Sequence, residues 1–347
     1  MAASVDVDSE LAYQAQLLPG VSRTFALTIP RMPRPLSDKV TNAYLLCRIA
    51  DTIEDDLSIP AAYKDALLAR FVEVVDGTVP SDDFVATSLA RLSPAVLPAE
   101  RELVARTGRV VGLTHSFAPP SRGAIQRCVR IMSQGMAKFA ARRSLDGLTD
   151  IGELDQYCYV VAGCVGEMLT DLFAVQSAPI RERHAELFPM ARSFGQGLQM
   201  TNILKDLWED RAAGACWLPR SVFDRHGCDL SALPAGRDTP GFAAGLRELI
   251  GIARGHLETS LRYTLLLPKN ETGIRDSCLW PMGLALLTLR RIHANPHFTQ
   301  GTDVKVSRRA VKGVIATSRV LGRSPRGLKA AFAFAGRGLP GPEIAGG

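Results

Sequence analysis

Helical periodicity is the feature that most limits what this 347-residue chain can fold into. From about Leu36 to Leu289, apolar residues recur three and four positions apart, and Pro and Gly fall at the breaks. No run alternates apolar and polar residues as a half-buried β-strand does. The pattern therefore predicts an all-α protein.

The periodic segments also predict where the helices lie. They cover residues 37–55, 61–75, 99–107, 123–142, 151–174, 182–208, 240–265, 281–294 and 308–321. We expect one helical domain over residues 21–321, preceded by an N-terminal segment of residues 1–20. A Gly-, Pro- and Arg-rich tail over residues 322–347 is expected to hold little order beyond a short helix near residues 329–335.

Composition excludes several classes of protein. Hydrophobic residues make up 46% of the chain, which is enough for a large core. The uncharged apolar stretches are shorter than the roughly 20 residues of a bilayer crossing, so no transmembrane helix is expected. The first ten residues are acidic and polar, unlike a secretory signal, which predicts a cytoplasmic protein. The seven cysteines stand singly in apolar segments and are expected to be small buried hydrophobes.

A formal net charge of +6 points to an anionic partner. Much of the excess lies late in the chain, in Lys305, Arg308, Arg309, Lys312, Arg319, Arg323, Arg326 and Lys329. The segment lacks interleaved aromatic residues that would stack on bases, so nucleic acid is disfavoured. Phosphorylated small molecules and an anionic membrane surface fit the charge equally well.

A first acidic motif, residues 51–55 (DTIED), lies in a segment that is otherwise apolar. On a helix, Tyr44, Arg48, Asp51 and Asp55 form one stripe only about 60 degrees wide. A helix that is apolar around the rest of its circumference should be buried, and buried carboxylates are costly unless a cation or hydrogen-bond donors compensate them. The stripe is therefore predicted to line a charged cavity. The alternative is an exposed helix edge with a local Arg-Asp pair.

A second acidic motif, residues 206–210 (DLWED), follows at a distance. Gln199, Asn202, Asp206 and Asp210 are three, four and four residues apart, which places them on one helical face. Other polar residues widen this face, so a half-exposed amphipathic helix is the alternative.

Two carboxylate pairs with amides nearby offer the oxygen ligands that Mg²⁺ takes, and diphosphate oxygens and water can fill the remaining positions. Neither pair has His or Cys beside it, which disfavours zinc. Metal ions that neutralise a diphosphate make it a better leaving group, so ionisation of an allylic diphosphate is the predicted chemistry. Arg23, Arg48 and Lys205 are the basic candidates for holding that anion.

These motifs resemble those of the squalene and phytoene synthase family, and within it the reductive squalene synthases. The matching segments are SRTF (22–25), RIADTIEDD (48–56), YCYVVAGCVG (157–166), QMTNILKDLWED (199–210) and CLWP (278–281), in the family's order. The resemblance implies a single-domain isoprenoid synthase bundle around a central cavity. It also implies Mg²⁺ and two molecules of farnesyl diphosphate as partners.

The resemblance further implies roles for individual residues. Asp51, Asp55, Asp206 and Asp210, with Asn202, would bind Mg²⁺ and the diphosphates, and Gln199 would support the second pair. Arg23, Arg48, Tyr44 and Lys205 would contact substrate, although Arg is common in the family where this chain has Lys205. Tyr157 would stabilise a cation near the reacting carbons, and Phe25, Ala162, Gly163 and Gly166 would border the isoprenoid chain. The alternatives are a buried structural tyrosine, tight helix packing and plain core.

The segment VKVSRR (304–309) resembles the stretch beside the nicotinamide nucleotide in reductive squalene synthases. Thr24, Lys305 and Arg308 would then contact NADPH, although a solvated basic face explains the charges equally well. No glycine-rich dinucleotide fingerprint is present, so a Rossmann site is not expected.

The resemblance as a whole implies head-to-head condensation to presqualene diphosphate and NADPH-dependent conversion to squalene, in sterol or hopanoid lipid biosynthesis. A non-reductive phytoene, dehydrosqualene or hydroxysqualene synthase is the rival interpretation. A non-catalytic assembly protein of the same fold is a more distant one. The C-terminal membrane helix of the eukaryotic pattern is missing from the sequence, so peripheral membrane contact at most is expected.

Overall fold

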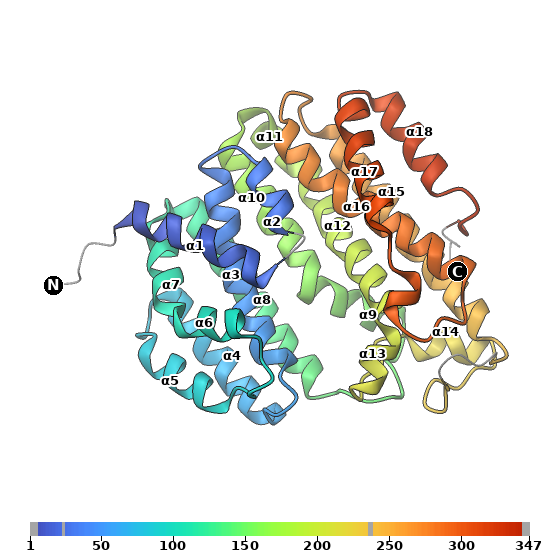
Figure 1. Cartoon of the computed structure of the whole chain (residues 1–347), viewed down its shortest axis with the longest axis horizontal. Coiled ribbons are helices and arrows are strands. Elements are labelled where there is room, and N and C mark those ends of the chain that lie inside the picture. The colour runs from blue at the N-terminus through green and yellow to red at the C-terminus, as the bar shows by residue number, and fades with distance from the viewer. Residues whose placement is uncertain (1–5, 23–24, 235–238, 342–347) are drawn as a thin grey trace. The chain divides into compact units, whose positions relative to one another are not determined.

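The computed structural model describes residues 6–22, 25–234 and 239–341 of the chain (Figure 1). Their regular secondary structure is helical, which confirms the all-α prediction; the β-pairing found among them is an isolated bridge between Leu148 and Pro219. The chain forms two compact units, residues 1–142 with 167–184 and residues 143–166 with 185–347. The domain limits predicted at residues 20 and 321 remain predictions.

The first unit is built around α3 (Leu36–Asp55), which contacts α1, α4, α6, α7 and α8. Apolar side chains on most of its circumference explain this central position, because Leu45, Leu46, Ile49 and Ile53 are fully buried. The other elements are α1 (Val7–Val21), α2 (Phe25–Thr28), the 3-10 turn η1 (Ile29–Arg31), α4 (Ala61–Asp76), α5 (Asp82–Arg91), α6 (Pro98–Ala105), α7 (Thr107–Ser116), α8 (Pro119–Ala140), the later part of α10 (Cys164–Gln176) and α11 (Ala178–Glu182).

The second unit is built around α15 (Phe242–Leu266) and α16 (Thr272–Ala294), which pack against each other across a short loop. Helix α16 also contacts α17 (Arg308–Leu321) and α18 (Pro325–Ala335). The other elements are α9 (Ile151–Cys158), the π-helical turn η2 (Tyr159–Gly163), the start of α10, α12 (His184–Lys205), α13 (Leu207–Ala212), α14 (Arg220–Arg225) and the 3-10 turn η3 (Gly301–Val304).

Several helix limits differ from the sequence prediction. Helices α1, α5 and α7 were not predicted; α5 buries only Phe84 and Ser88, which is too little apolar surface to give a clear periodic signal. Helix α16 begins at Thr272 and continues through Pro281, where it was predicted to begin. Buried residues ahead of the proline, such as Ile274, hold that first part in place, so tertiary packing overrides the proline.

The tail is more ordered than predicted. Helix α18 begins at Pro325, and the Ser324 side chain caps it by accepting a hydrogen bond from the Gly327 amide at 3.1 Å. Leu328 and Leu339 are buried, so apolar contacts hold the described part of the tail to the rest of its unit.

Arg275 is a buried cation that joins helix ends in the second unit. Its guanidinium donates to the carbonyls of Thr264 at 2.6 Å, Leu267 at 2.7 Å and Gly322 at 2.9 Å. These carbonyls lie at the C-terminal ends of α15 and α17, where backbone acceptors lack partners within the helix. Arg275 therefore caps both helices at once.

The helical stretch Ile151–Gln176 is long and apolar enough to cross a bilayer by length and composition, although no transmembrane helix was expected. Half of its apolar window is buried inside the protein, which is typical of a core helix. The seven cysteines are buried thiols, as predicted.

Candidate active site

The stripe predicted on α3 is present in the structure. Arg48 approaches Asp51 to 3.8 Å and forms a closer ion pair with Glu100 of α6. The Tyr44 hydroxyl donates to the carbonyl of Val21 at 3.1 Å. Arg48 is thus fixed between two carboxylates, and helical spacing alone places it beside the acidic motif.

The acidic side chains at the end of α3 crowd one another. The pKa of Asp51 is raised to about 7, first by burial and then by the neighbouring Asp55, and Arg48 opposes the rise. The pKa of Glu54 is raised to about 8, mainly by burial and then by the charge of Asp55. Burial raises the pKa of Asp55 as well. Raised pKa values mean that the charged forms lack compensation from the protein's own groups. This end of α3 therefore favours a bound cation.

Asp56, the next residue, behaves in the opposite way. It accepts hydrogen bonds from the amide and hydroxyl of Ser58 at 2.9 and 2.7 Å and from the amide of Ser93 at 2.6 Å. These bonds lower the pKa of Asp56 despite its burial. Asp56 therefore ends α3 and anchors a loop, and does not belong to the crowded group.

Other residues predicted in the first unit have mixed outcomes. The ring of Phe25 lies 5.1 Å from the ring of Tyr44, and Phe25 is exposed rather than part of the core. Arg23 and Thr24 lie outside the described residues, so their predicted contacts stay predictions. Glu100 was not singled out in the sequence, because nothing local in its own helix indicates that it pairs with Arg48.

The second acidic motif is divided between two helices, where one continuous helix was predicted. Helix α12 ends at Lys205, and Asp206 precedes α13, which carries Asp210. The bonds from the Asp206 amide to the Asn202 carbonyl (2.8 Å) and from the Asp210 amide to the Asp206 carbonyl (2.9 Å) keep a helical spacing across the break. Lys205 lies 3.0 Å from the Asp206 carboxylate, and burial raises the pKa of Asp206 against this attraction.

The segment that precedes Lys305 is tied to this motif. The Gly301 amide at the start of η3 donates to the Glu209 carboxylate at 2.7 Å. A side chain at Gly301 would meet the Lys205 carbonyl at 3.0 Å and the Asp206 carboxylate at 3.1 Å. The close approach leaves little room for a side chain at this position and holds η3 against the second acidic motif. Lys305 and Arg308, just beyond η3, are exposed.

Two tyrosines lie close to the start of the π-helical turn, Tyr157 in the last turn of α9 and Tyr159 as the first residue of η2. The ring of Tyr157 stacks on Trp217, with centroids 4.3 Å apart. The ring of Tyr159 lies 4.0 Å below the guanidinium of Arg192. Because π-helical turns inside helices are frequent at functional sites, Tyr159 joins Tyr157 as a candidate. The family resemblance assigns a role to Tyr157 and none to Tyr159.

Small residues of the motif 157–166 pack closely against α12. A Cβ atom on Gly166 would meet the Ala191 carbonyl oxygen at 2.1 Å, and one on Gly195 would meet the Ala162 carbonyl oxygen at 2.1 Å. A Cβ atom on Gly163 would meet the Tyr159 ring at 2.9 Å. Helix packing is therefore a sufficient reason for these small residues, and a contact of Ala162, Gly163 or Gly166 with substrate stays a prediction.

Over the described residues, no group of three or more His, Cys, Asp or Glu side chains is placed to hold a metal ion by protein ligands alone. Asp51 and Asp55 lie on α3, whereas Asp206 and Asp210 flank the start of α13. Each pair can supply oxygen ligands, with the other positions left to water or substrate.

Comparisons with known proteins agree with these motifs. The sequence profile of the squalene/phytoene synthase family matches residues 18–310. A squalene synthase of Candida albicans is 28% identical over 326 residues, which covers 90% of this chain and 68% of the relative. The Botryococcus squalene synthase of Botryococcus braunii is 29% identical over 304 residues, covering 87% of this chain and 62% of the relative.

Solved structures show the same fold. A complex of TcSQS with a ligand is similar with a TM-score of 0.76 and 26% identity, covering 94% of this chain and 91% of the other. A dehydrosqualene synthase in complex with a ligand has a TM-score of 0.68 at 21% identity, covering 92% of this chain and 98% of the other. With two acidic motifs on helices and a family match over most of its length, this chain is an enzyme of the squalene/phytoene synthase family.

Proposed function

We propose that this enzyme joins two molecules of farnesyl diphosphate head to head to give presqualene diphosphate and then converts that intermediate, with NADPH, to squalene. The observation that carries the proposal is the crowded carboxylate stripe of α3, with Arg48 held beside Asp51. The relatives from Candida albicans and Botryococcus braunii are squalene synthases, which supports squalene as the product.

The residues present fit Mg²⁺. The candidate metal ligands are carboxylate and amide oxygens. The raised pKa values of Asp51 and Asp55 reflect negative charge that a bound cation would compensate. Asp51 and Asp55 would hold metal in the first unit, and Asp206, Asp210 and Asn202 in the second. When bound, Mg²⁺ would neutralise the charge that develops on a diphosphate as its allylic C–O bond breaks.

The side chains of the protein would bind the diphosphate and stabilise the carbocation. Arg48, Arg23 and Lys205 would contact diphosphate oxygens, and Glu100 keeps the Arg48 guanidinium in place. Tyr157 and Tyr159 present aromatic faces that stabilise a nearby carbocation. A site closed to water is needed, because solvent captures carbocations.

The fit to NADPH rests on Lys305 and Arg308, which follow η3 and are exposed to a soluble ligand. The bond from Gly301 to Glu209 ties this segment to the second acidic motif. When bound, NADPH would supply the hydride that ends the second half-reaction. Squalene is a lipid, so the proposal includes a cytoplasmic enzyme that releases its product to a membrane.

A non-reductive synthase is the second candidate, since the fold is shared with a dehydrosqualene synthase. Incubation of purified protein with farnesyl diphosphate and Mg²⁺, with and without NADPH, separates the two. We expect squalene only with NADPH and presqualene diphosphate without it. Phytoene-type or dehydrosqualene products in both reactions would support the second candidate. Absence of any product would favour a non-catalytic assembly protein.

A further inference from the structure

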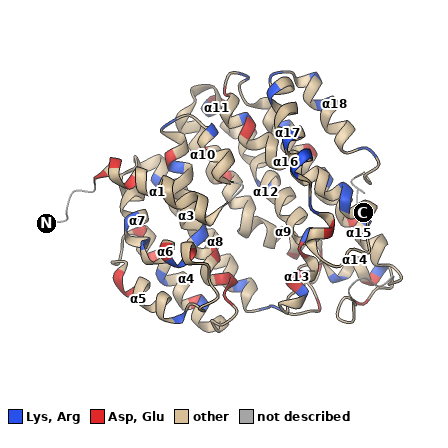
Figure 2. Cartoon of the chain, in the orientation of Figure 1, with Lys and Arg blue, Asp and Glu red and all other residues tan. Residues whose placement is uncertain are grey.

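The C-terminal helices carry an unusual concentration of positive charge. Residues 305–341 contain nine Lys and Arg and no Asp or Glu, whereas the rest of the chain has a formal charge of −3. All nine side chains are exposed, and none forms an ion pair with any residue that the structure describes. The basic character of this protein is therefore local to one segment, which includes α17 and α18 (Figure 2).

Helix α17 separates its basic residues from the face that packs on α16. At about 100 degrees per residue, Lys312 and Arg319 lie within about 20 degrees of each other and about 140 to 160 degrees from Val314. Val314 packs so closely on α16 that a Cβ atom on Gly283 would lie 2.8 Å from it. The basic face of α17 therefore points away from its own unit.

Two large apolar side chains are exposed beside these charges. Val320 at the end of α17 is 79% exposed and Phe334 at the end of α18 is 73% exposed, the highest values among large hydrophobic residues in the described part of the chain. Arg319 precedes Val320 directly, and Arg337 follows Phe334 by three residues, just beyond the end of α18. Exposed apolar residues flanked by cations are typical of surfaces that lie at a membrane interface.

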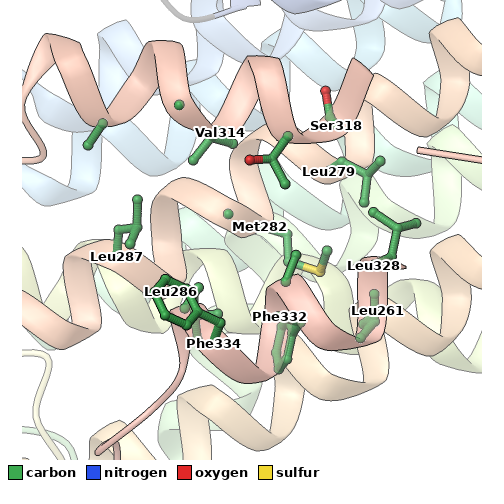
Figure 3. A pocket seen from close by; sticks show the side chains of 16 residues that line it. Leu261, Leu279, Met282, Leu286, Leu287, Val314, Ser318, Leu328, Phe332 and Phe334 are labelled. Carbon is green, nitrogen blue, oxygen red and sulfur yellow. The ribbon is translucent and has the colours of Figure 1, made fainter. Parts of the chain in front are cut away.

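Phe334 also borders an apolar cavity of about 270 Å³ between α16, α17 and α18 (Figure 3). Leu279, Met282 and Leu286 of α16 line it, with Leu328 and Phe332 of α18 opposite. Apart from the hydroxyls of Thr317 and Ser318 the lining is apolar, so the cavity suits hydrocarbon better than phosphate or nucleic-acid bases. The basic side chains would match the anionic headgroup layer of a lipid leaflet, and the apolar cavity would match its hydrocarbon layer.

We propose that the face formed by α17 and α18 docks on an anionic lipid bilayer. The basic residues approach the headgroups, while Val320 and Phe334 enter the hydrocarbon boundary and the cavity behind Phe334 takes apolar lipid. An RNA would use the same charges but would gain little from an exposed valine or an apolar cavity. The inference does not depend on which product the enzyme makes.

Vesicle sedimentation with the full-length protein tests this proposal. We expect binding to phosphatidylcholine vesicles that contain phosphatidylglycerol, little binding to pure phosphatidylcholine, and release at high salt. The triple variant Lys312→Gln, Arg319→Gln, Arg323→Gln should weaken partitioning by on the order of 100-fold. The double variant Val320→Ser, Phe334→Ser should weaken it by on the order of 10-fold and leave the salt dependence in place.

A matched triple variant in the first unit, Arg34→Gln, Arg91→Gln, Arg106→Gln, removes the same charge from exposed positions and should bind vesicles like the unchanged protein. Circular dichroism of every variant checks that the fold persists. The proposal would be overturned if both triple variants bound vesicles equally, or if the protein did not bind anionic vesicles at low salt. It would also be overturned if the protein bound RNA tightly and the double variant Val320→Ser, Phe334→Ser bound RNA equally well. Because the readout is sedimentation, its failure leaves the proposed reaction untouched.

Discussion

Asp51 and Asp56 lie near the same end of α3, and their surroundings act on them in opposite ways. Asp51 is 30% exposed, has Arg48 at 3.8 Å, accepts no hydrogen bond from the residues that the structure describes, and has a raised pKa. Asp56 accepts three close hydrogen bonds and has a lowered pKa. The charged form of Asp51 lowers the stability of the folded protein, which indicates a role in binding a ligand. The charged form of Asp56 raises that stability, which indicates a structural role.

Substitution by asparagine should therefore separate the two residues. Asp51→Asn should reduce turnover by at least on the order of 100-fold and raise the free energy of unfolding of the metal-free protein at pH 8 by on the order of 1 kcal/mol. Asp56→Asn should lower the free energy of unfolding by about 1–3 kcal/mol and leave turnover of the folded protein in place. Denaturant unfolding and product assays check both, and the reverse assignment would contradict these roles.

The raised pKa values also predict a pH dependence. The native state keeps a proton on Asp51, with a pKa of about 7, that the unfolded chain releases near pH 4, so the metal-free protein should lose stability as pH rises from about 4 to 7. Mg²⁺ needs deprotonated carboxylates, so it should raise the melting temperature more at pH 8 than at pH 6. A larger Mg²⁺ effect at pH 6, measured by thermal unfolding, would contradict this account.

At the residue scale, sequence spacing predicts some features and misses others. It places Tyr44, Arg48, Asp51 and Asp55 on one stripe because the helical repeat is local. It misses the pairing of Arg48 with Glu100, 52 residues away, because such a contact depends on how α3 packs against α6. Local rules carry no information on that packing.

At the scale of secondary-structure elements, Arg275 connects the ends of α15 and α17, and no sequence pattern indicates this connection. Its three bonds to carbonyls at the ends of α15 and α17 replace the partners that those carbonyls lack. Arg275 is 1% exposed and has no carboxylate among these partners, so it was indistinguishable in sequence from a surface arginine.

Replacing Arg275 by Met should cost about 2–4 kcal/mol in the free energy of unfolding, because buried carbonyls lose charged donors. Arg262→Met, at an exposed position of α15 with one bond to Thr259, is the control and should change it by less than about 0.5 kcal/mol. Chemical denaturation measures both values. Equal effects would show that Arg275 does not cap these helices.

Helix existence was more predictable than helix limits. The strongly apolar α3 begins one residue before its predicted range and ends where predicted, because burial around its circumference fixes it. Helix α12 ends at Lys205, short of the predicted residue 208, and α16 runs through Pro281. The difference lies at the end of α12 and at the start of α16, and periodicity does not report the packing that sets such limits.

At the scale of the whole molecule, the proposal assigns one carboxylate pair to each compact unit. Asp51 and Asp55 belong to the first unit, and Asp206 and Asp210 belong to the second. Helical periodicity predicted the all-α fold, and the ordered motifs predicted the family, whose profile matches residues 18–310. The proposed reductive step would depend on a few contacts around Lys305 and Arg308, and the sequence motifs specify these contacts less clearly.

The most direct measurement follows deuterium from NADPH into the product. Purified protein is incubated with farnesyl diphosphate, Mg²⁺ and NADPH that carries transferable deuterium, and the C30 hydrocarbon is analysed by mass spectrometry. Squalene with one deuterium is the predicted result, because one hydride ends the reaction. A C30 hydrocarbon without deuterium, formed equally well when NADPH is left out, would contradict the reductive account.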